Sequence, residues 1–359
     1  MKQKLICLLL AGAMALSLFG CTQGESSSAP EATPTPEVSD TSSAVEEEPQ
    51  ASYPVTLTDA AGREITIEEE PEKLVSGYYI TTSMFIALGQ EEKLVGIEAK
   101  ADSRPIYSLA AADLLELPSV GTAKQFDLEG CAALEPDLVI LPLKLKDQTE
   151  ALEDLGINVL LVNPEDMDLL NETVEMLGAA VGAQEKADEL LNYNEETQAF
   201  LKETVGSEEK PKVYLGGNSS FLSTAGAKMY QNTLIELGGG ENVAAGLEDD
   251  YWAEVSYEQV LEWNPEVIVI VPEAEYTRDD VLNDAQLADV DAVKNGRVYE
   301  MPSSFEAWDS PVPSAMLGSR WMAAVLHDDV YSFEDFQKDA ADFYLTFYDV
   351  EIDQSLLTK

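Results

Sequence analysis

The chain has 359 residues and is strongly acidic, with 21 Lys and Arg against 68 Asp and Glu and a formal net charge of −47 at pH 7. This charge argues against nucleic-acid binding, because such binding gains its affinity by neutralising phosphates with cations. The single histidine, His327, argues against a Ser-His-Asp triad and against a histidine-rich zinc site. We expect His327 at the surface near a helix end, without a catalytic role.

The first 20 residues are typical of a targeting segment. Lys2 and Lys4 precede the apolar run LICLLLAGAMALSLFG, which is shorter than the ~20 residues of a membrane-spanning helix. Residues 18–21, Leu-Phe-Gly-Cys, resemble the lipobox of bacterial lipoproteins, which implies cleavage before Cys21 and lipidation of its thiol. An ordinary secretory signal and an uncleaved membrane helix are the alternatives.

Residues 21–53 are rich in Ser, Thr, Pro, Glu and Ala. Such a composition cannot bury a core, so it predicts a disordered tether that starts at the lipid anchor. With Cys7 in the targeting segment and Cys21 lipidated, Cys131 has no disulfide partner. Cys131 lies in an apolar helical stretch, and we expect it to be a small core residue.

Two parts of the remaining chain look alike. Residues 128–142 (LEGCAALEPDLVILP) and residues 257–272 (YEQVLEWNPEVIVIVP) each give a short helix, a proline and an apolar strand, in that order. In a second matching pair, residues 155–164 and 295–302, a glycine turn leads into a strand that ends at proline. This duplication predicts two α/β lobes, and a chance match between α/β segments is the alternative.

A long helix is predicted over Gln184–Val205, between the two matching parts. The stretch has no Gly or Pro, and its apolar residues recur at spacings of three and four. It would be roughly 30 Å long, about the width of a small domain. We expect it to join an N-terminal lobe, residues 54–183, to a C-terminal lobe, residues 206–359.

Within the lobes, strands and helices alternate, which predicts open, mostly parallel sheets covered on both faces. A hairpin is predicted at residues 55–67. The expected strands are 74–77, 94–98, 119–121, 137–141 and 158–162 in the first lobe and 212–216, 267–271 and 297–301 in the second. The main further helices are expected at 169–181, 314–326 and 333–348.

Six phrases carry a resemblance to a known family: VTLTDAAGREITIEEEPEKLVS, LGQEEKLVGIEA, VGTAKQFDLEGCAALEPDLVIL, GGGENVAA, YEQVLEWNPEVIVIV and AVKNGRVYEMP. Over residues 54–348 the chain resembles the class III substrate-binding proteins of ABC importers, which take up ferric siderophores, haem and cobalamin. The resemblance implies two Rossmann-like lobes bridged by one helix, with small closure around a ligand in the cleft.

The resemblance also implies a binding protein rather than an enzyme, without a cofactor of its own. It implies a monomer, lipid-anchored on the extracytoplasmic face of the cell membrane, that delivers its ligand to an ABC permease and its ATPase. A surface adhesin or structural lipoprotein is the alternative from another class.

Ligands of open α/β sheets bind beyond the carboxyl ends of the strands. In the first lobe these positions carry cations, against the acidic composition, which indicates an anion-binding pocket; solvated loop lysines are the alternative. Nearby aromatic residues suit a ring-bearing ligand, or else they pack in the core. A ferric siderophore is therefore predicted, with haem or a corrinoid as alternatives, and no catalytic or metal-ligating residue is predicted. The predicted ligand-binding residues are Tyr78, Tyr79, Lys100, Arg104, Lys124, Lys144, Asn218, Tyr251, Trp252, Tyr276 and Trp308.

Members of this family often present a glutamate on each lobe to arginines of the permease. In the first lobe Asp147 or Glu150 matches this role. The matching region of the second lobe has Lys228 where an acid is expected, so either Glu236 or Glu241 would take its place or docking would differ.

Overall fold

The computed structural model describes residues 53–248 and 251–359. The predicted signal segment, the lipidation site Cys21 and all of the tether except Tyr53 lie outside the described residues. None of the described helices is both long enough and apolar enough to cross a membrane.

The first sheet has four strands in the order β4-β3-β7-β8, and all its neighbours run parallel. Its central strand β7 is buried along its whole length, as expected for a strand covered on both faces. The strands are β3 (Leu74–Ser76), β4 (Leu94–Gly96), β7 (Leu138–Pro142) and β8 (Asn158–Val162). The other elements of this part are the short strands β5 (Gly121–Thr122) and β6 (Gln125–Phe126), the helices α1 (Tyr79–Ala87), α2 (Pro105–Ala110), α3 (Leu128–Ala133), α4 (Thr149–Glu153) and α5 (Met167–Val181), and the 3-10 helices η1 (Glu91–Lys93), η2 (Ala101–Ser103), η3 (Ala112–Glu116) and η4 (Leu143–Gln148).

The second sheet has the order β12-β10-β9-β13-β14, with β11 also paired to β9. Strands β9, β11, β13 and β14 run parallel, whereas β10 and β12 join in antiparallel pairs. The strands are β9 (Lys212–Gly216), β10 (Ser223–Thr224), β11 (Glu241–Asn242), β12 (Ala253–Glu254), β13 (Val267–Ile270) and β14 (Val298–Glu300). The helices of this part are α7 (Tyr230–Leu237), α8 (Tyr257–Trp263), α9 (Arg278–Asn283), α10 (Asp291–Lys294), α11 (Ala315–Leu326), α12 (Phe333–Tyr348) and the 3-10 helix η5 (Gln354–Leu356).

The duplicated sequence folds into the same unit twice. Helix α3 leads to β7 and helix α8 leads to β13, and each strand lies between two parallel neighbours. Before the proline of each unit stands a residue with positive φ, Glu135 (φ 51) or Asn264 (φ 44), which ends the helix. Cys131 in α3 is fully buried and unpaired, which confirms its prediction as a core residue.

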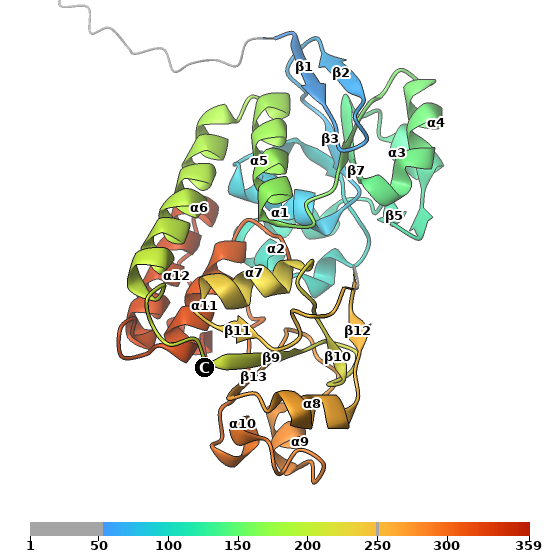
Figure 1. Ribbon diagram of the computed structural model, residues 1–359. Coiled ribbons are helices and arrows are strands. Elements are labelled where there is room, and N and C mark those ends of the chain that lie inside the picture. Colours follow the sequence, from blue (N-terminus) through green and yellow to red (C-terminus); the bar gives the residue numbers. More distant parts are fainter. Residues whose placement is uncertain (1–52, 249–250) are drawn as a thin grey trace, which may run out of the picture. The chain divides into compact units, whose positions relative to one another are not determined.

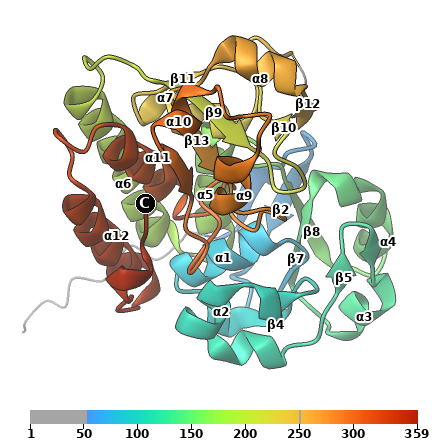
Figure 2. The same ribbon diagram turned by 90° about the horizontal axis from the view of Figure 1, so that it is seen from below.

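Two long helices pack across the two sheet-containing parts. Helix α6 (Gln184–Thr204) packs against α5 of the first part and, further along its length, against α7 and α11 of the second part (Figure 1). Helix α12 contacts α1 of the first part, and its Phe343 lies 4.9 Å from Tyr193 of α6 between ring centroids. Figure 2 shows α12 beside α6 and α11. The predicted connecting helix is therefore present, and α12 reinforces it.

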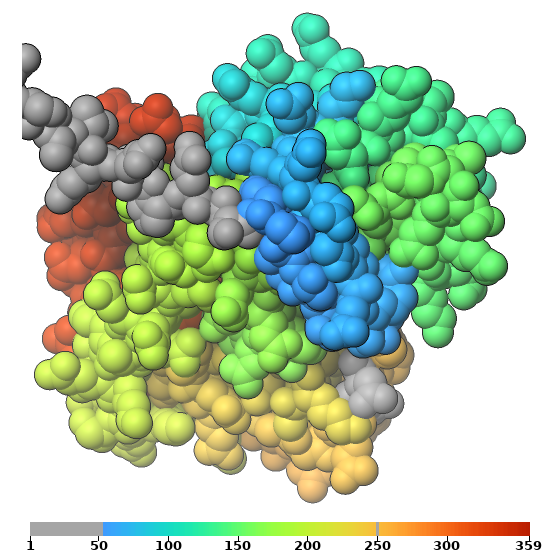
Figure 3. All heavy atoms as spheres, turned by 90° about the horizontal axis from the view of Figure 1, so that it is seen from above, coloured from blue at the N-terminus to red at the C-terminus, as the bar shows by residue number. Residues whose placement is uncertain are grey.

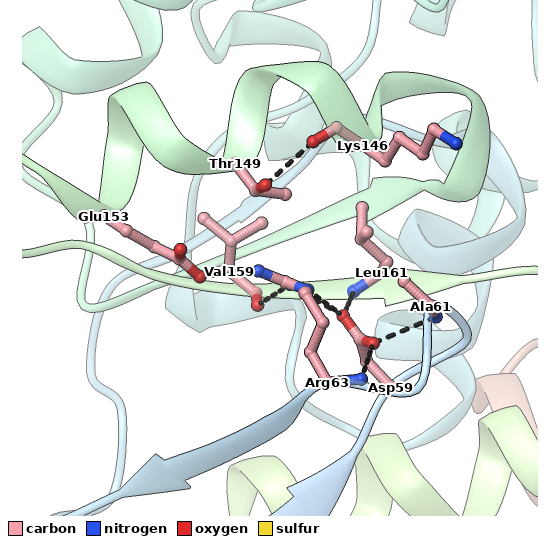
Figure 4. Close-up of polar contacts among 8 residues, drawn as sticks. All are labelled: Asp59, Ala61, Arg63, Lys146, Thr149, Glu153, Val159 and Leu161. Carbon is pink, nitrogen blue, oxygen red and sulfur yellow. Dashed lines mark hydrogen bonds and ion pairs between the residues drawn. The ribbon is translucent and has the colours of Figure 1, made fainter.

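The N-terminal hairpin, β1 (Val55–Thr58) and β2 (Glu64–Ile67), lies on the outer face of the first part, against α5 and β8 (Figure 3). Its turn is built around Asp59, whose side chain is fully buried. This carboxylate accepts hydrogen bonds from the backbone N–H groups of Ala61 (2.9 Å) and Leu161 (3.2 Å) and pairs with the guanidinium of Arg63 (2.6 Å) (Figure 4). The network thus fastens the hairpin to strand β8.

The expectation that His327 lies at the surface was wrong. His327 caps the C-terminal end of α11 as predicted, but it is buried rather than on the surface, with 6% of its area exposed. Its Nε2 lies 3.1 Å from the carbonyl oxygen of Gly239. The ring fills the space beside a glycine with positive φ, where an added Cβ would lie 2.6 Å from that nitrogen.

Candidate ligand-binding site

A small cavity lies between the two parts of the chain. Its volume is about 20 Å³, enough for about one water molecule. One wall comes from α1 and the start of α2, and the other from the loops that follow β13 and β14. The lining residues are Tyr79, Ser83, Arg104, Pro105, Ile106, Tyr107, Glu273, Ser303, Phe305, Glu306, Ala307 and Val312.

Arg104 is the cation that lines this cavity. Its guanidinium carbon lies 4.2 Å from the ring centroid of Tyr79, so one face of the guanidinium stacks on an aromatic ring. Its Nη1 lies 4.0 Å from Oε1 of Glu273, which belongs to the opposite wall. With about 29% of its side chain exposed, Arg104 keeps access to a ligand between the walls.

A buried carboxyl group holds the Arg104 wall in place. Glu98 accepts hydrogen bonds from Oγ1 of Thr82 on α1 (2.6 Å) and from the hydroxyl of Tyr107 on α2 (2.9 Å). The Tyr107 hydroxyl also lies 3.1 Å from the carbonyl oxygen of Tyr79. Burial raises the pKa of Glu98, although these two hydrogen bonds oppose the rise. The network fixes α1 against α2, and so it brings Tyr79 and Arg104 together.

A second buried carboxyl group, Glu306, joins the two walls. It accepts a hydrogen bond from Oγ of Ser83 on α1, and others from Ser314 (2.5 Å) and from the hydroxyl of Tyr348 on α12 (2.8 Å). Burial raises its pKa, while the three donors and the more distant Arg104 act in the opposite direction. The cavity lining therefore contains the carboxyl groups of Glu273 and Glu306 as well as the cation Arg104.

Tyr78 lies beside a lining residue of this cavity, and three other predicted site residues, Lys144, Tyr251 and Trp252, do not line it. The ring of Tyr78 packs edge-on against Tyr79 at 5.2 Å. Nζ of Lys144 from the first part lies 5.9 Å from the ring centroid of Tyr251 from the second part. Trp252 is half-buried and lies over Gly217, where an added Cβ would come within 2.8 Å of its ring, so only glycine leaves room for this contact.

The structure does not bring all the predicted site residues together. Lys100 and Lys124 are exposed and do not line the cavity. Asn218 is exposed after β9, and Tyr276 lines a separate surface cavity with Ser219, Ser220 and Tyr257. Asp147 and Glu150 are exposed in η4 and α4. Within the described residues, 53–248 and 251–359, no three His, Cys, Asp or Glu side chains are grouped to hold a metal ion.

Trp308 is the clearest departure from the predicted site. Its side chain is fully buried, its Nε1 donates a hydrogen bond to the hydroxyl of Tyr344 (3.0 Å), and its ring packs against Phe336 at 5.7 Å. Gly318 lets the backbone of Trp308 approach α11, because an added Cβ would lie 2.8 Å from the Trp308 carbonyl oxygen. Trp308 is therefore a core residue in this structure, and the prediction of ligand contact was wrong.

Of the lining residues, the sequence reasoning named only Tyr79 and Arg104, and those that it missed include Ser83, Glu273 and Glu306. A signal for Glu273 was present, because it follows the Pro272 that ends the apolar run of β13, and ligands bind beyond such strand ends. Ser83 lies inside a helix, and Glu306 lies several residues beyond β14. No pattern in the sequence singles out either residue.

Comparison with protein families identifies the chain. The model of the periplasmic binding protein family matches residues 74–305, which cover both sheets and most of the residues that line the cavity between them. The chain belongs to this family. It is a class III substrate-binding protein of an ABC importer, so the family inferred from the six sequence phrases is confirmed.

Individual relatives share the fold but differ in what their names state. The chain is 26% identical over 319 residues to the molybdate-binding protein MolA of Haemophilus influenzae, covering 81% of this chain and 90% of that protein. It is 28% identical over 262 residues to the uncharacterized ABC transporter substrate-binding lipoprotein YvrC of Bacillus subtilis, covering 69% and 78%. The crystal structure of a periplasmic solute binding protein from Veillonella parvula aligns with a TM-score of 0.75 and 26% identity, over 84% of this chain and 95% of that one.

Membership of the family fixes the general function. The protein is an extracytoplasmic binding protein, not an enzyme, and it delivers a small ligand to an ABC permease. The α/β fold with two sheets agrees with the two-lobe architecture expected from the sequence.

Proposed function

We propose that this protein captures an anionic, metal-bearing ligand, a ferric siderophore, between its two lobes, with Arg104 as the charge partner. The observation that carries the proposal is the placement of Arg104, which stacks on Tyr79 at 4.2 Å and faces a cavity lined by both parts of the chain. The lobe boundaries at residues 54–183 and 206–359 are part of this proposal.

The aromatic surroundings support a ligand with rings. Tyr79 lines the cavity with Tyr78 packed against it, and Tyr251 and Trp252 of the second part carry further rings, with Lys144 over the ring of Tyr251. Aromatic catecholate groups stack on such rings, and their negative charge favours nearby cations. Haem or a corrinoid would use the same aromatic surfaces, so these remain the alternative ligands within the same transport role.

A small metal oxyanion is a second candidate, for a specific reason. The cavity of about 20 Å³ is far below the several hundred Å³ of typical ligand pockets, so a siderophore must move the two walls apart, whereas a compact oxyanion needs much less movement. Arg104 and the hydroxyls of Ser303 and Tyr79 offer donors for such an anion. The relation to a protein named for molybdate binding supports this candidate.

Ligand titration of the purified protein tests the proposal. Wild type, Arg104→Ala and Lys202→Ala are compared for binding of a ferric tris-catecholate, molybdate, haemin and cobalamin by intrinsic fluorescence. Lys202 is an exposed lysine of α6, so its variant removes one charge away from the cavity. We expect the ferric tris-catecholate to bind and Arg104→Ala to weaken it about tenfold to a hundredfold, as for a lost hydrogen bond to a charged group, with Lys202→Ala unchanged.

Other outcomes of this titration point to other conclusions. Molybdate binding without catecholate binding would select the second candidate. Binding of neutral or cationic ligands alone, with no effect of Arg104→Ala, would overturn the proposed anion site.

We also propose that the protein is anchored by lipid on Cys21, with Asp147 or Glu150 at the permease contact. The lipobox-like residues 18–21 and the description of the Bacillus subtilis relative as a lipoprotein support the anchor. In the native host, we expect Cys21→Ala to accumulate as unprocessed precursor, while Cys131→Ala matures normally if it folds. Gel mobility and a lipid-labelling assay measure this. Normal processing and lipid labelling of the Cys21→Ala protein would disprove the anchor.

A further inference from the structure

The carboxylate of Glu273 lies where an anionic group of a ligand would approach Arg104. Tyr79 covers one face of the guanidinium, and Glu273 stands at the Nη1 edge, 4.0 Å away, from the opposite wall of the cavity. Both residues line the cavity, so the ion pair spans the space between the two walls. A ligand anion that binds at the Nη1 edge of Arg104 must take the place of this carboxylate.

Glu273 stands in an unusual backbone conformation. Glu273 has φ 59, a left-handed conformation that is uncommon for residues other than glycine. It stands in a turn after β13 and not at a helix end, where Glu135, Asn264 and Asp349 adopt positive φ. On the opposite wall, Lys100 (φ 68) precedes η2, which leads directly to Arg104. Unusual backbone conformations of this kind concentrate at ligand-binding loops.

The ion pair of Arg104 and Glu273 is weak enough for a ligand anion to replace the carboxylate. About 29% of the Arg104 side chain and 59% of the Glu273 side chain are exposed, so water screens their attraction. Another contact between the walls at this cavity, from Ser83 to Glu306, is buried. Separation of Arg104 from Glu273 therefore costs little, whereas the Ser83 contact at the rear of the cavity is better protected from water.

We propose that Glu273 is a specificity-determining residue that competes internally with the ligand for Arg104. A ligand must displace its carboxylate, so the site selects anions with more charge, or more oxygen atoms, than a single carboxylate. Without ligand, the same pair links the two walls of the cavity. This inference rests on the proposed anion site at Arg104 and adds a selection rule to it.

Glu273→Gln tests the competition, because glutamine keeps the shape and removes the charge. The probes are the ferric tris-catecholate and molybdate, and whichever binds wild type is titrated. We expect Glu273→Gln to bind it about two- to fivefold more tightly, the range of an exposed ion pair. The matched control is Glu275→Gln, an exposed carboxylate two residues further along the same loop, which should change affinity by less. In an Arg104→Ala background, Glu273→Gln should have no effect.

A second measurement needs no ligand. In the free protein, Glu273→Gln should speed amide hydrogen exchange in residues 99–105 and 271–276, because the link between the walls is lost, whereas Glu275→Gln should not affect residues 99–105. If Arg104→Ala weakens binding but Glu273→Gln leaves both affinity and exchange at wild-type values, the competition is refuted and the anion site stands. If neither probe binds wild type, the proposed ligand classes fail, and the exchange result alone decides whether Glu273 links the walls.

Discussion

At the scale of single residues, the buried Asp309 makes the stability of the folded protein depend on pH. Its carboxyl group is buried, with 9% of the residue exposed, and burial raises its pKa to about 7, while a hydrogen bond from Gln231 acts in the opposite direction. The unfolded chain would titrate this group near its usual value of 3.8. Between these two values the folded protein retains a proton that the unfolded chain has lost. The contribution of Asp309 to stability is therefore complete below about pH 4 and is lost as the pH rises to about 7.

Asp309→Asn isolates this effect, because asparagine resembles the protonated acid at every pH. We expect the variant to gain stability relative to wild type as the pH rises from 4 to 8, by on the order of 1 to 4 kcal/mol. Urea unfolding at several pH values measures this difference. Asp113→Asn, at an exposed position, is the control and should show a much flatter difference. An Asp309→Asn difference that stays constant with pH would show that Asp309 is ionised in the folded protein throughout.

The limits of sequence reasoning are clearest at this scale. The rule that ligands bind beyond strand ends singled out Tyr79 and Arg104, which both line the cavity, because parallel strands bring their carboxyl ends to one edge. The same rule failed for Trp308, because the chain after β14 turns inward and packs its indole between Tyr344 and Phe336. Such packing depends on residues of α11 and α12 that follow later in the chain, so local sequence carries no sign of it.

At the scale of elements, the N-terminal hairpin depends on one buried ion pair. The Asp59 side chain has no exposed area and accepts backbone hydrogen bonds from its own turn and from β8, while Arg63 reaches the carbonyl oxygen of Val159 (2.9 Å). In Figure 4 the side chain of Lys146 extends away from this cluster, so Arg63 is the cation that balances Asp59. The position of the hairpin therefore rests on polar contacts as well as on packing against α5.

Asp59→Ala should destabilise the protein by roughly 1 to 3 kcal/mol, because it leaves the buried N–H group of Leu161 and the N–H groups of the turn without their acceptor. The control is Glu153→Gln, which removes the other, more exposed partner of Arg63 (43% exposed) and should cost less than about 1 kcal/mol. Chemical unfolding gives both values. Equal costs for the two variants would contradict the central role assigned to Asp59.

The bounds of helices and strands were predictable where the local sequence pattern decides them. Strands β8 and β9 and helix α12 have the predicted bounds, because apolar runs or periodic apolar faces end at clear breakers. The two-residue strands β10 and β12 escaped prediction, because their antiparallel pairing comes from long-range contacts and not from an alternating pattern. The sequence also failed to predict that α12 would pack across both parts.

At the scale of the whole chain, the net charge is strongly negative, whereas the cavity presents the cation Arg104. A chain with a formal charge of −47 repels anions at long range, so an anionic ligand depends on the short-range attraction of Arg104 and its hydroxyl neighbours. Helices α6 and α12 both connect the two parts, which favours small movements about this connection over a wide opening. The limited movement of the two parts favours a compact ligand or one that is only partly enclosed.

The central claim is that an anionic metal-bearing ligand binds beside Arg104 and between the two parts of the chain. Anomalous X-ray diffraction from crystals of the protein with a ferric tris-catecholate, and separately with molybdate, tests it most directly, because the metal gives its own signal. We predict one metal peak for the ligand that binds in solution, in the space bounded by Arg104, Tyr79 and the loop of Glu273. A bound metal far from Arg104, or ordered ligand on the outer surface alone, would contradict the claim.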